Sequence, residues 1–139
     1  EHGFANSRAR LRMTTLYQVA AANKGIVVGT GNKVEDFGVG FYTKYGDGGV
    51  DISPIADCNK SEVWELGKEL GIIKEIIDAP PTDGLWDDGR TDEGQLGFKY
   101  SELEDAMGNP NSPHREQYEK IRNQNLHKME PIPVCKIPS

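Results

Sequence analysis

The chain has 139 residues, enough for one compact domain and too few to suggest two. Its 36% hydrophobic residues and net charge of −6 are typical of a soluble globular protein, and no apolar run approaches eighteen residues, so we expect no membrane span. The acidic balance argues against nucleic acid as a main partner, which needs a clustered basic surface, but a few placed basic groups can still hold a nucleotide.

Cysteine and histidine usage gives no sign of a metal cluster. Cys58 and Cys135 are too few for a disulfide framework, and the three histidines are far apart and lack metal-ligand spacing. We therefore expect reduced thiols and a cytoplasmic location. The first residues resemble neither a signal peptide nor a transit peptide, and patterned sequence begins without an initiator Met, so we expect the native chain to start earlier.

The first third of the chain favours a helix followed by a strand. From about residue 7 to residue 23, apolar residues recur at helical spacing, and Asn23-Lys24-Gly25 supplies a glycine stop. The apolar run at 26–29 is bounded by glycine and is typical of a strand buried on both faces of a parallel sheet.

The middle of the chain begins with an irregular stretch. Residues 30–49 are rich in glycine, polar groups and aromatics, and residues 50–55 resemble a short strand end that runs into Pro54. Asn59 is a good N-cap for a helix that Gly71 terminates.

The second half alternates loops and helices. Residues 78–97 lack periodicity, and a segment this long in a small domain is usually functional or mobile, so we expect a mobile loop at 82–97. The pattern predicts a short helix from Tyr100 to Met107 and a charged, exposed helix over about residues 113–126. The tail at 131–139 carries three prolines and is expected to be extended.

A possible nucleotide crevice follows the first predicted strand. Gly29-Thr30 lies at the carboxyl end of that strand, where ligands bind in open α/β sheets. Glu35 follows five residues after Thr30, and a carboxylate among hydroxyl and backbone oxygens suits Mg²⁺ carried on nucleotide phosphates. Spacing alone fits a strand-end turn with a solvated acid more simply, so both interpretations stay open here.

Basic residues flank this crevice. Lys60 would sit in the first turn of a helix whose free N–H groups favour anions, and Lys44 lies near the glycine-rich turn. Alternate residues of a helix point in different directions, so Arg8, Arg10 and Arg12 cannot all serve one face, although one could reach an anionic ligand. Taken singly, all of these residues are better explained as surface groups.

Several short motifs occur in a specific order along the chain. They are Arg8-Ala9-Arg10-Leu11-Arg12-Met13, Gly29-Thr30 with Glu35, the run from Phe41 to Asp51, Asn59-Lys60, the run from Ala79 to Leu85, Thr91-Asp92-Glu93 and His127-Lys128. This series resembles the second half of an NAD synthetase over nearly the whole chain. Its most specific part is the Thr-Lys-Tyr-Gly-Asp-Gly-Gly run with its trailing Asp.

The resemblance implies an α/β fold of the ATP-pyrophosphatase type, a Rossmann-like parallel sheet flanked by helices. Residues 1–139 would form only its C-terminal half, within an enzyme that assembles as a homodimer. The ammonia-dependent bacterial members use ATP and Mg²⁺ to adenylate the nicotinate carboxylate of deamido-NAD, releasing pyrophosphate. Ammonia then displaces AMP from the adenylate and gives NAD.

The resemblance also assigns roles to individual residues. Positions that contact ATP are matched by Thr30, Lys60 and Thr82, and a magnesium ligand is matched by Glu35. Positions that contact deamido-NAD are matched by Arg10, Lys44, Asp51, His127 and Lys128. Arg8 and Arg12 are expected to be salt-bridged or solvated.

The chain departs from the family pattern in two places. The pyrophosphate loop, a Ser-Gly-Gly-x-Asp-Ser run, is absent with the strands around it. ATP then lacks a cradle and magnesium lacks a carboxylate partner, so we expect these 139 residues alone to be inactive. One extra residue also lies between Glu35 and Lys44 relative to the bacterial pattern, which affects the direction of Glu35.

Two alternatives remain. Another ATP pyrophosphatase, such as a GMP-synthetase-like amidotransferase, shares the adenylate chemistry, but it is not expected to carry the run from Lys44 to Asp51 in this form. The chain could also be a non-catalytic fragment that dimerises or binds the dinucleotide. The compact ending after His127-Lys128 favours ammonia over glutamine as the nitrogen donor without deciding between them.

Overall fold

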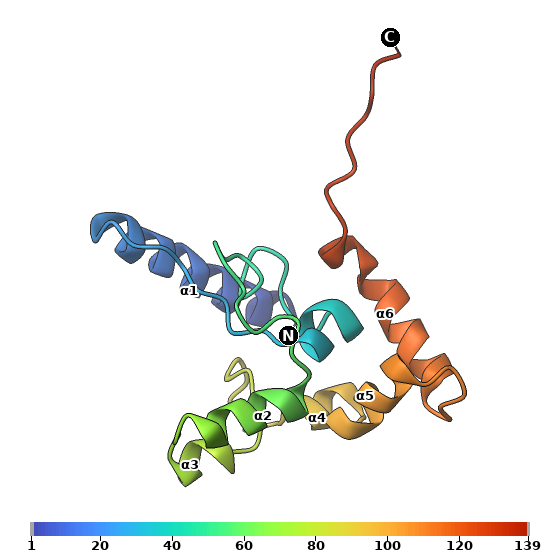
Figure 1. The fold of residues 1–139 in the computed structure, drawn as a ribbon. Coiled ribbons are helices and arrows are strands. Elements are labelled where there is room, and N and C mark those ends of the chain that lie inside the picture. The colour runs from blue at the N-terminus through green and yellow to red at the C-terminus, as the bar shows by residue number, and fades with distance from the viewer. Residues whose placement is uncertain (1, 139) are drawn as a thin grey trace.

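The computed structural model describes residues 2–138 and consists of helices joined by extended segments (Figure 1). In chain order the elements are α1 (His2–Ala22), the π-helix η1 (Val34–Val39), α2 (Lys60–Glu69), α3 (Lys74–Ile77), α4 (Asp92–Leu96), α5 (Tyr100–Gly108) and α6 (Arg115–Met129). In Figure 1, α1 and α6 lie on opposite sides of η1, α2 to α5 form a row below them, and the chain after α6 leads away from the other elements.

The first helix begins at His2, five residues before its predicted start, and it ends where the sequence indicates. Lys24 adopts the left-handed conformation with φ of 55°, and the N–H of Gly25 donates to the carbonyl of Ala20 at 2.8 Å. This bond closes the last turn in the manner of a left-handed helix cap.

The prediction of a parallel sheet with strands at 26–29 and 50–55 is wrong for the described residues, which contain no strand. The two segments do run side by side, but only one parallel bridge joins Val28 to Ile52. These two side chains stay 51% and 47% exposed. Two paired segments without further strands bury too little apolar surface to form a stable sheet.

The hydrophobic core lies where η1 meets α5 and α6. Its buried members are Val34, Val39, Phe98, Tyr100, Leu103, Ala106 and Tyr118. Val34 and Val39 are fully buried although five positions separate them, a spacing that turns side chains about 140° apart in an α-helix. The wider turn of the π-helix brings both into the same core.

The π-helix η1 begins one residue before Glu35 and lies mostly within the interval from Glu35 to Lys44, where one extra residue was predicted relative to the bacterial pattern. A ring closed by an i→i+5 hydrogen bond holds one residue more than an α-helical turn, and such turns are frequent at functional sites. Glu35 lies on this element, between the buried Val34 and Val39.

Side chains of α6 bind the main-chain carbonyls at the end of η1, which have no partner within the helix. Three residues spaced three apart on α6 each donate to a carbonyl: Arg122 to Gly38 at 3.0 Å, Asn125 to Val39 at 2.9 Å and Lys128 to Gly40 at 2.8 Å. Residues at this spacing lie along one face of a helix. The orientation of α6 against η1 is set by these bonds.

The remaining segments follow the predictions in part. Helices α2, α5 and α6 confirm the three helices predicted after Asn59, with ends that differ by at most three residues. Helix α4 lies inside 82–97, which was predicted without regular structure, and begins where Thr91 Oγ1 accepts from the N–H of Gly94. Residues 131–138 contain neither helix nor strand, and residue 139 lies outside the described part.

Large apolar side chains remain exposed on the helices, among them Leu11 and Leu16 on α1 and Leu66 and Ile76 on α2 and α3. Contiguous apolar surface usually marks a place where another chain or segment packs. Within residues 2–138, none of the helices combines the length and the hydropathy needed to cross a bilayer.

We predict that Leu103→Ala destabilises the fold by about 2–5 kcal/mol, because it leaves a cavity in the core between α5 and η1. The free energy of unfolding in urea measures the effect. Leu70→Ala, at an exposed position after α2, is the matched control and should change stability by no more than about 0.5 kcal/mol. Equal effects at the two sites would contradict the assigned core.

Candidate functional site

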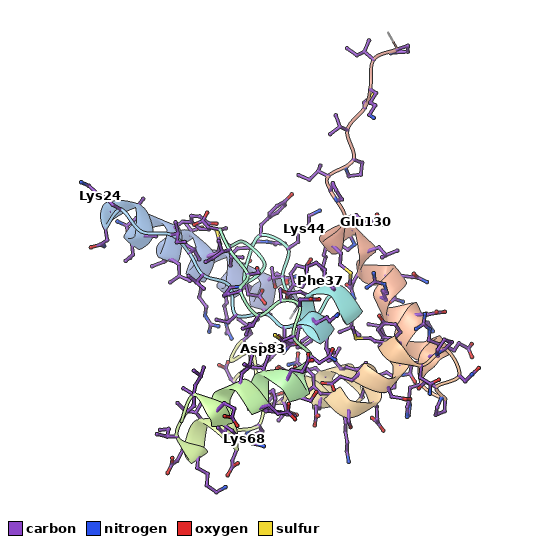
Figure 2. The ribbon with its side chains drawn as sticks, viewed as in Figure 1. Lys24, Phe37, Lys44, Lys68, Asp83 and Glu130 are labelled. Atoms are coloured by element: carbon purple, nitrogen blue, oxygen red, sulfur yellow. The ribbon has the colours of Figure 1, made fainter. Side chains whose placement is uncertain are left out.

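A cavity of about 450 Å³ lies among α1, η1, α2 and the segment before α4. Four residues predicted to form a nucleotide and magnesium site line it together: Thr30, Glu35, Lys60 and Thr82. Asp83, which also lines the cavity, lies between α1 and α2 in Figure 2. Side chains separated by up to 52 positions in the sequence thus share one space.

A second cavity of about 340 Å³ lies against the first. It contains Lys44 and Lys128, two residues predicted to contact a dinucleotide, and Figure 2 shows Lys44 near the end of α6. The wall common to both cavities is formed by Gly29, Gly31, Asp36, Asp47 and Val50. Among the described residues, the predicted contacts Arg10, Asp51 and His127 line neither cavity.

The Glu35 carboxylate is held on both oxygens. Its Oε1 accepts from the Tyr100 hydroxyl at 2.6 Å and pairs with Lys60 Nζ at 3.5 Å, and its Oε2 accepts from the N–H of Asn32 at 3.3 Å. An ionised carboxylate offers about four acceptor positions. One position on Oε2 therefore remains for a ligand in the cavity.

Carboxylates of the protein bind N–H groups at the start of α2, which were predicted to be free to favour an anionic ligand. The N–H and the hydroxyl of Ser61 both donate to Glu104, at 3.0 and 2.7 Å, and the N–H of Asn59 donates to Glu62. Carboxylates of the protein thus already occupy this helix end. The charge that remains available to an anionic ligand is the ammonium of Lys60, which pairs with Glu35 and lies over the Tyr100 ring.

Asp92 and Tyr100 belong to the site although neither was predicted to have a role. Asp92 is 7% exposed, lines the first cavity and has its Oδ2 3.5 Å from the Tyr100 hydroxyl, while its buried Oδ1 has no partner within residues 2–138. Burial, together with the charges of Glu35 and Asp83, raises the pKa of Asp92 to about 6. Asp92 stood in the Thr91-Asp92-Glu93 motif, whereas no sequence signal indicated Tyr100.

The wall between the two cavities carries another perturbed carboxyl group. Asp36 is half-buried, and burial followed by the charges of Glu35 and Asp47 raises its pKa to about 6. A side chain on Gly31 would collide with it, since a Cβ there would lie 2.3 Å from Asp36 Oδ1. The absence of a side chain at Gly31 therefore leaves the space that the Asp36 carboxyl group occupies between the cavities.

The three arginines of α1 divide according to their directions. Arg8 and Arg12, one turn apart, donate to the carbonyls of Leu85 and Gly84 at 2.6 and 2.9 Å. Arg8 also pairs with Asp87 at 3.8 Å and both arginines are exposed, in accord with the prediction that they are salt-bridged or solvated. Their bonds to main-chain carbonyls additionally anchor the segment before α4. Arg10 points elsewhere and donates from Nε to the carbonyl of Lys44 at 3.2 Å.

The glycine-rich turn at residues 46–49 packs closely on α1 and on the Tyr42 ring. A Cβ on Gly46 would lie 2.9 Å from the Cβ of Ala9, and a Cβ on Gly48 would lie 2.5 Å from the Tyr42 ring. The Thr43 hydroxyl also hydrogen-bonds to Asn6 at 2.8 Å. Glycine is required at these positions because of the close approach.

The second cavity is framed by bonds to the end of α6. Lys44 Nζ donates to the carbonyl of His127 at 2.7 Å, and the Tyr42 hydroxyl donates to the carbonyl of Lys128 at 2.5 Å. The ammonium of Lys128 is bound by the carbonyls of Gly40 and Tyr42, both at 2.8 Å. Burial lowers the pKa of Lys128. Through its two carbonyl bonds this lysine stabilises the wall of the cavity.

Asp51, like Lys128, binds a main-chain group of the protein. Its carboxylate accepts from the N–H of Val27 at 2.8 Å and from the Tyr17 hydroxyl at 3.2 Å. These bonds tie the two extended segments to each other and to α1. His127 is exposed at the end of α6.

The first cavity has the chemistry that Mg²⁺ uses when it is bound with a nucleotide. Within the described part of the chain, no three His, Cys, Asp or Glu residues gather as a metal cluster. Glu35 and Asp92 nevertheless offer an open acceptor position and an unpartnered oxygen to the same space. Magnesium is commonly held by one or two carboxylates plus substrate phosphates, so these residues fit it.

Comparison with protein families places the whole motif series in one group. A family model described as NAD synthase matches residues 2–137. The NH(3)-dependent NAD(+) synthetase of Alkaliphilus oremlandii is 44% identical over 135 residues, which cover 96% of this chain and 53% of the relative. That of Carboxydothermus hydrogenoformans is 50% identical over 100 residues, covering 72% and 40%. The chain spans about half the length of the curated relatives it matches.

Two solved structures are also similar. The NMN synthetase from Francisella tularensis has a TM-score of 0.88 and 39% identity, covering 96% of this chain and 56% of that one. The NH3-dependent NAD synthetase from Campylobacter jejuni has a TM-score of 0.67 and 25% identity, covering 94% and 54%. The family match favours NAD synthase over the GMP-synthetase-like alternative.

We predict that Lys128→Met destabilises the fold by about 1–3 kcal/mol, because it leaves the carbonyls of Gly40 and Tyr42 without their charged donor. Thermal and urea unfolding of the ligand-free chain measure the loss. Lys120→Met, at an exposed position on the same helix, is the control and should change little. A Lys128 variant as stable as the control would show that the ammonium serves only a ligand.

Proposed function

The chain belongs to the NAD synthase family, and we propose that it is one part of a ligase that forms NAD from deamido-NAD, ATP and ammonia. The observation that carries the proposal is the convergence of the predicted ATP and magnesium residues on one cavity, with two predicted dinucleotide residues in the cavity beside it. ATP and the acceptor must meet for the carboxylate to be adenylated. Adjacent cavities that share a wall meet this requirement.

In this proposal the first cavity holds ATP. Lys60 binds a phosphate as a point charge, since the N–H groups at the start of α2 are used by Glu62 and Glu104. Thr30 and Thr82 line the same cavity. Glu35 binds Mg²⁺, which when bound neutralises charge on the phosphates during the transfer.

The second cavity holds deamido-NAD. Lys44 and Lys128 line it. Arg10 and His127 each hydrogen-bond to Lys44, and we assign them, with Asp51, a part in binding from outside the lining. Because Lys128 and Asp51 bind main-chain groups, we assign them a mainly supporting part in forming the wall. Asp36 and Asp47 lie on the wall shared with the ATP cavity, where the nicotinate carboxylate would meet the α-phosphate.

The reaction has two steps. An oxygen of the nicotinate carboxylate attacks the α-phosphate of ATP, and pyrophosphate leaves. Ammonia then adds to the carbonyl carbon of the NAD-adenylate, AMP leaves with that oxygen, and a proton is lost to give the amide. Most of the rate enhancement comes from positioning the two substrates and from neutralising phosphate charge.

The 139 residues alone are proposed to be inactive. The apolar side chains exposed on α1, α2 and α3 fit a surface that a remaining half of the enzyme, or a second copy in a homodimer, covers. Segments 26–29 and 50–55, already joined by one parallel bridge, would extend into a sheet when further strands pair with them. We place the complete enzyme in the cytoplasm.

The test is an assay of the complete enzyme with deamido-NAD labelled with ¹⁸O in its carboxylate. We expect NAD, AMP and pyrophosphate in equal amounts, with one ¹⁸O in the AMP, and no product from residues 1–139 alone. Lys60→Met should raise the dissociation constant for ATP about tenfold or more, since a charged contact is lost. Lys68→Met, exposed on the same helix, should not change it. Unlabelled AMP would contradict the adenylate.

A second acceptor is favoured by one observation, the likeness to the NMN synthetase of Francisella tularensis. The same chemistry on nicotinate mononucleotide would give NMN, with no adenosine half of a dinucleotide to bind. We expect the larger kcat/KM for deamido-NAD, in accord with the curated relatives. A larger value for the mononucleotide would reassign the acceptor and leave the ATP site unchanged.

A further inference from the structure

Tyr100 lies where the elements around the first cavity meet. It is 1% exposed and begins α5. Its hydroxyl is 2.6 Å from Glu35 of η1 and 3.5 Å from Asp92 of α4. Its ring packs edge-on against Trp64 of α2 and beneath the ammonium of Lys60, 5.0 Å from the ring centre. One side chain therefore touches η1, α2 and α4.

The hydroxyl has one proton and two carboxylates within reach. The 2.6 Å distance identifies Glu35 Oε1 as the acceptor of that proton, in a charge-assisted bond that is shorter and stronger than a neutral one. With Lys60 on the same oxygen and the N–H of Asn32 on the other, the Glu35 carboxylate is fixed in direction. Its one remaining acceptor position then has a defined place in the cavity.

The same tyrosine is held by the helix that precedes it. Glu93 Oε1 accepts the N–H of Tyr100 at 3.0 Å, and the N–H of Asp92 donates to the carbonyl of Pro81 at 3.0 Å. The segment that carries Thr82 and the tyrosine that binds Glu35 are therefore joined through α4. A displacement of α4 would remove two of the contacts that locate Tyr100.

We propose that Tyr100 is a positioning residue, which holds Glu35 in the orientation that binds the ATP-bound cation and links that orientation to the docking of residues 82–97. The proposal rests on the proposed function, because it takes Glu35 as the cation ligand. The hydroxyl acts through Glu35 and touches no substrate. Groups that orient a metal ligand in this way typically contribute ten- to hundredfold in metal affinity.

The ring and the hydroxyl of Tyr100 are separable. The ring belongs to the core with Leu103 and Ala106, whereas the hydroxyl points to the two carboxylates of the cavity. Tyr100→Phe keeps the ring and removes only the hydroxyl. Tyr118→Phe is the matched control, because Tyr118 lies in the same core and its ring contacts Arg115 of α6.

The experiment measures Mn²⁺ binding by water-proton relaxation to the complete enzyme with a non-hydrolysable ATP analogue. Tyr100→Phe should raise the dissociation constant for Mn²⁺ about ten- to hundredfold. In turnover, it should raise the Mg²⁺ concentration needed for half-maximal rate, and saturating Mg²⁺ should restore most of kcat. A purely structural defect would not be rescued in this way. Tyr118→Phe should leave Mn²⁺ affinity unchanged.

Unchanged Mn²⁺ affinity in folded Tyr100→Phe enzyme would overturn the proposal, as would a loss of kcat that excess Mg²⁺ does not restore. If Tyr100→Phe does not fold, Glu93→Ala decides the question, since it removes the acceptor of the Tyr100 N–H without changing a side chain that lines the first cavity, and it should also weaken Mn²⁺ binding. Wild-type enzyme that binds Mn²⁺ with the analogue but makes no NAD would refute the proposed reaction while leaving the binding comparison intact.

Discussion

The carbonyl groups at the C-terminal end of η1 have no partner inside that helix, and α6 supplies the side chains that bind them. Arg122, Asn125 and Lys128 lie three positions apart, so a single face of α6 meets successive carbonyls. Leaving such groups buried and unpaired costs about 1–3 kcal/mol each. This requirement fixes α6 against η1, and it gives Lys128 a part in the fold before any ligand is present.

From this contact the geometry of the site follows. The π-helical turn buries Val34 and Val39 in one core while Glu35, between them, faces the cavity. Because η1 is held on one side by α6 and on the other by Tyr100 of α5, Glu35 has little freedom to turn.

Sequence reasoning succeeded where the determinants are local and failed where they are distant. The boundaries of α2 and α5 follow from Asn59 and from the break at 109–113, and the order of short motifs indicated the family. The sheet was not found, because a strand needs neighbours that residues 2–138 do not contain. The contact of Tyr100 with Glu35 joins positions 65 residues apart and depends on packing that no periodicity encodes.

Part of the exposed apolar surface lies at the first cavity. Leu16 and Val28 are more than half exposed, and both line the cavity that contains Thr30 and Glu35. Contiguous exposed apolar side chains often mark a surface on which another chain or segment packs. A segment that packs on Leu16 and Val28 would also close this cavity, so burial of apolar surface and exclusion of water from the cavity would be coupled.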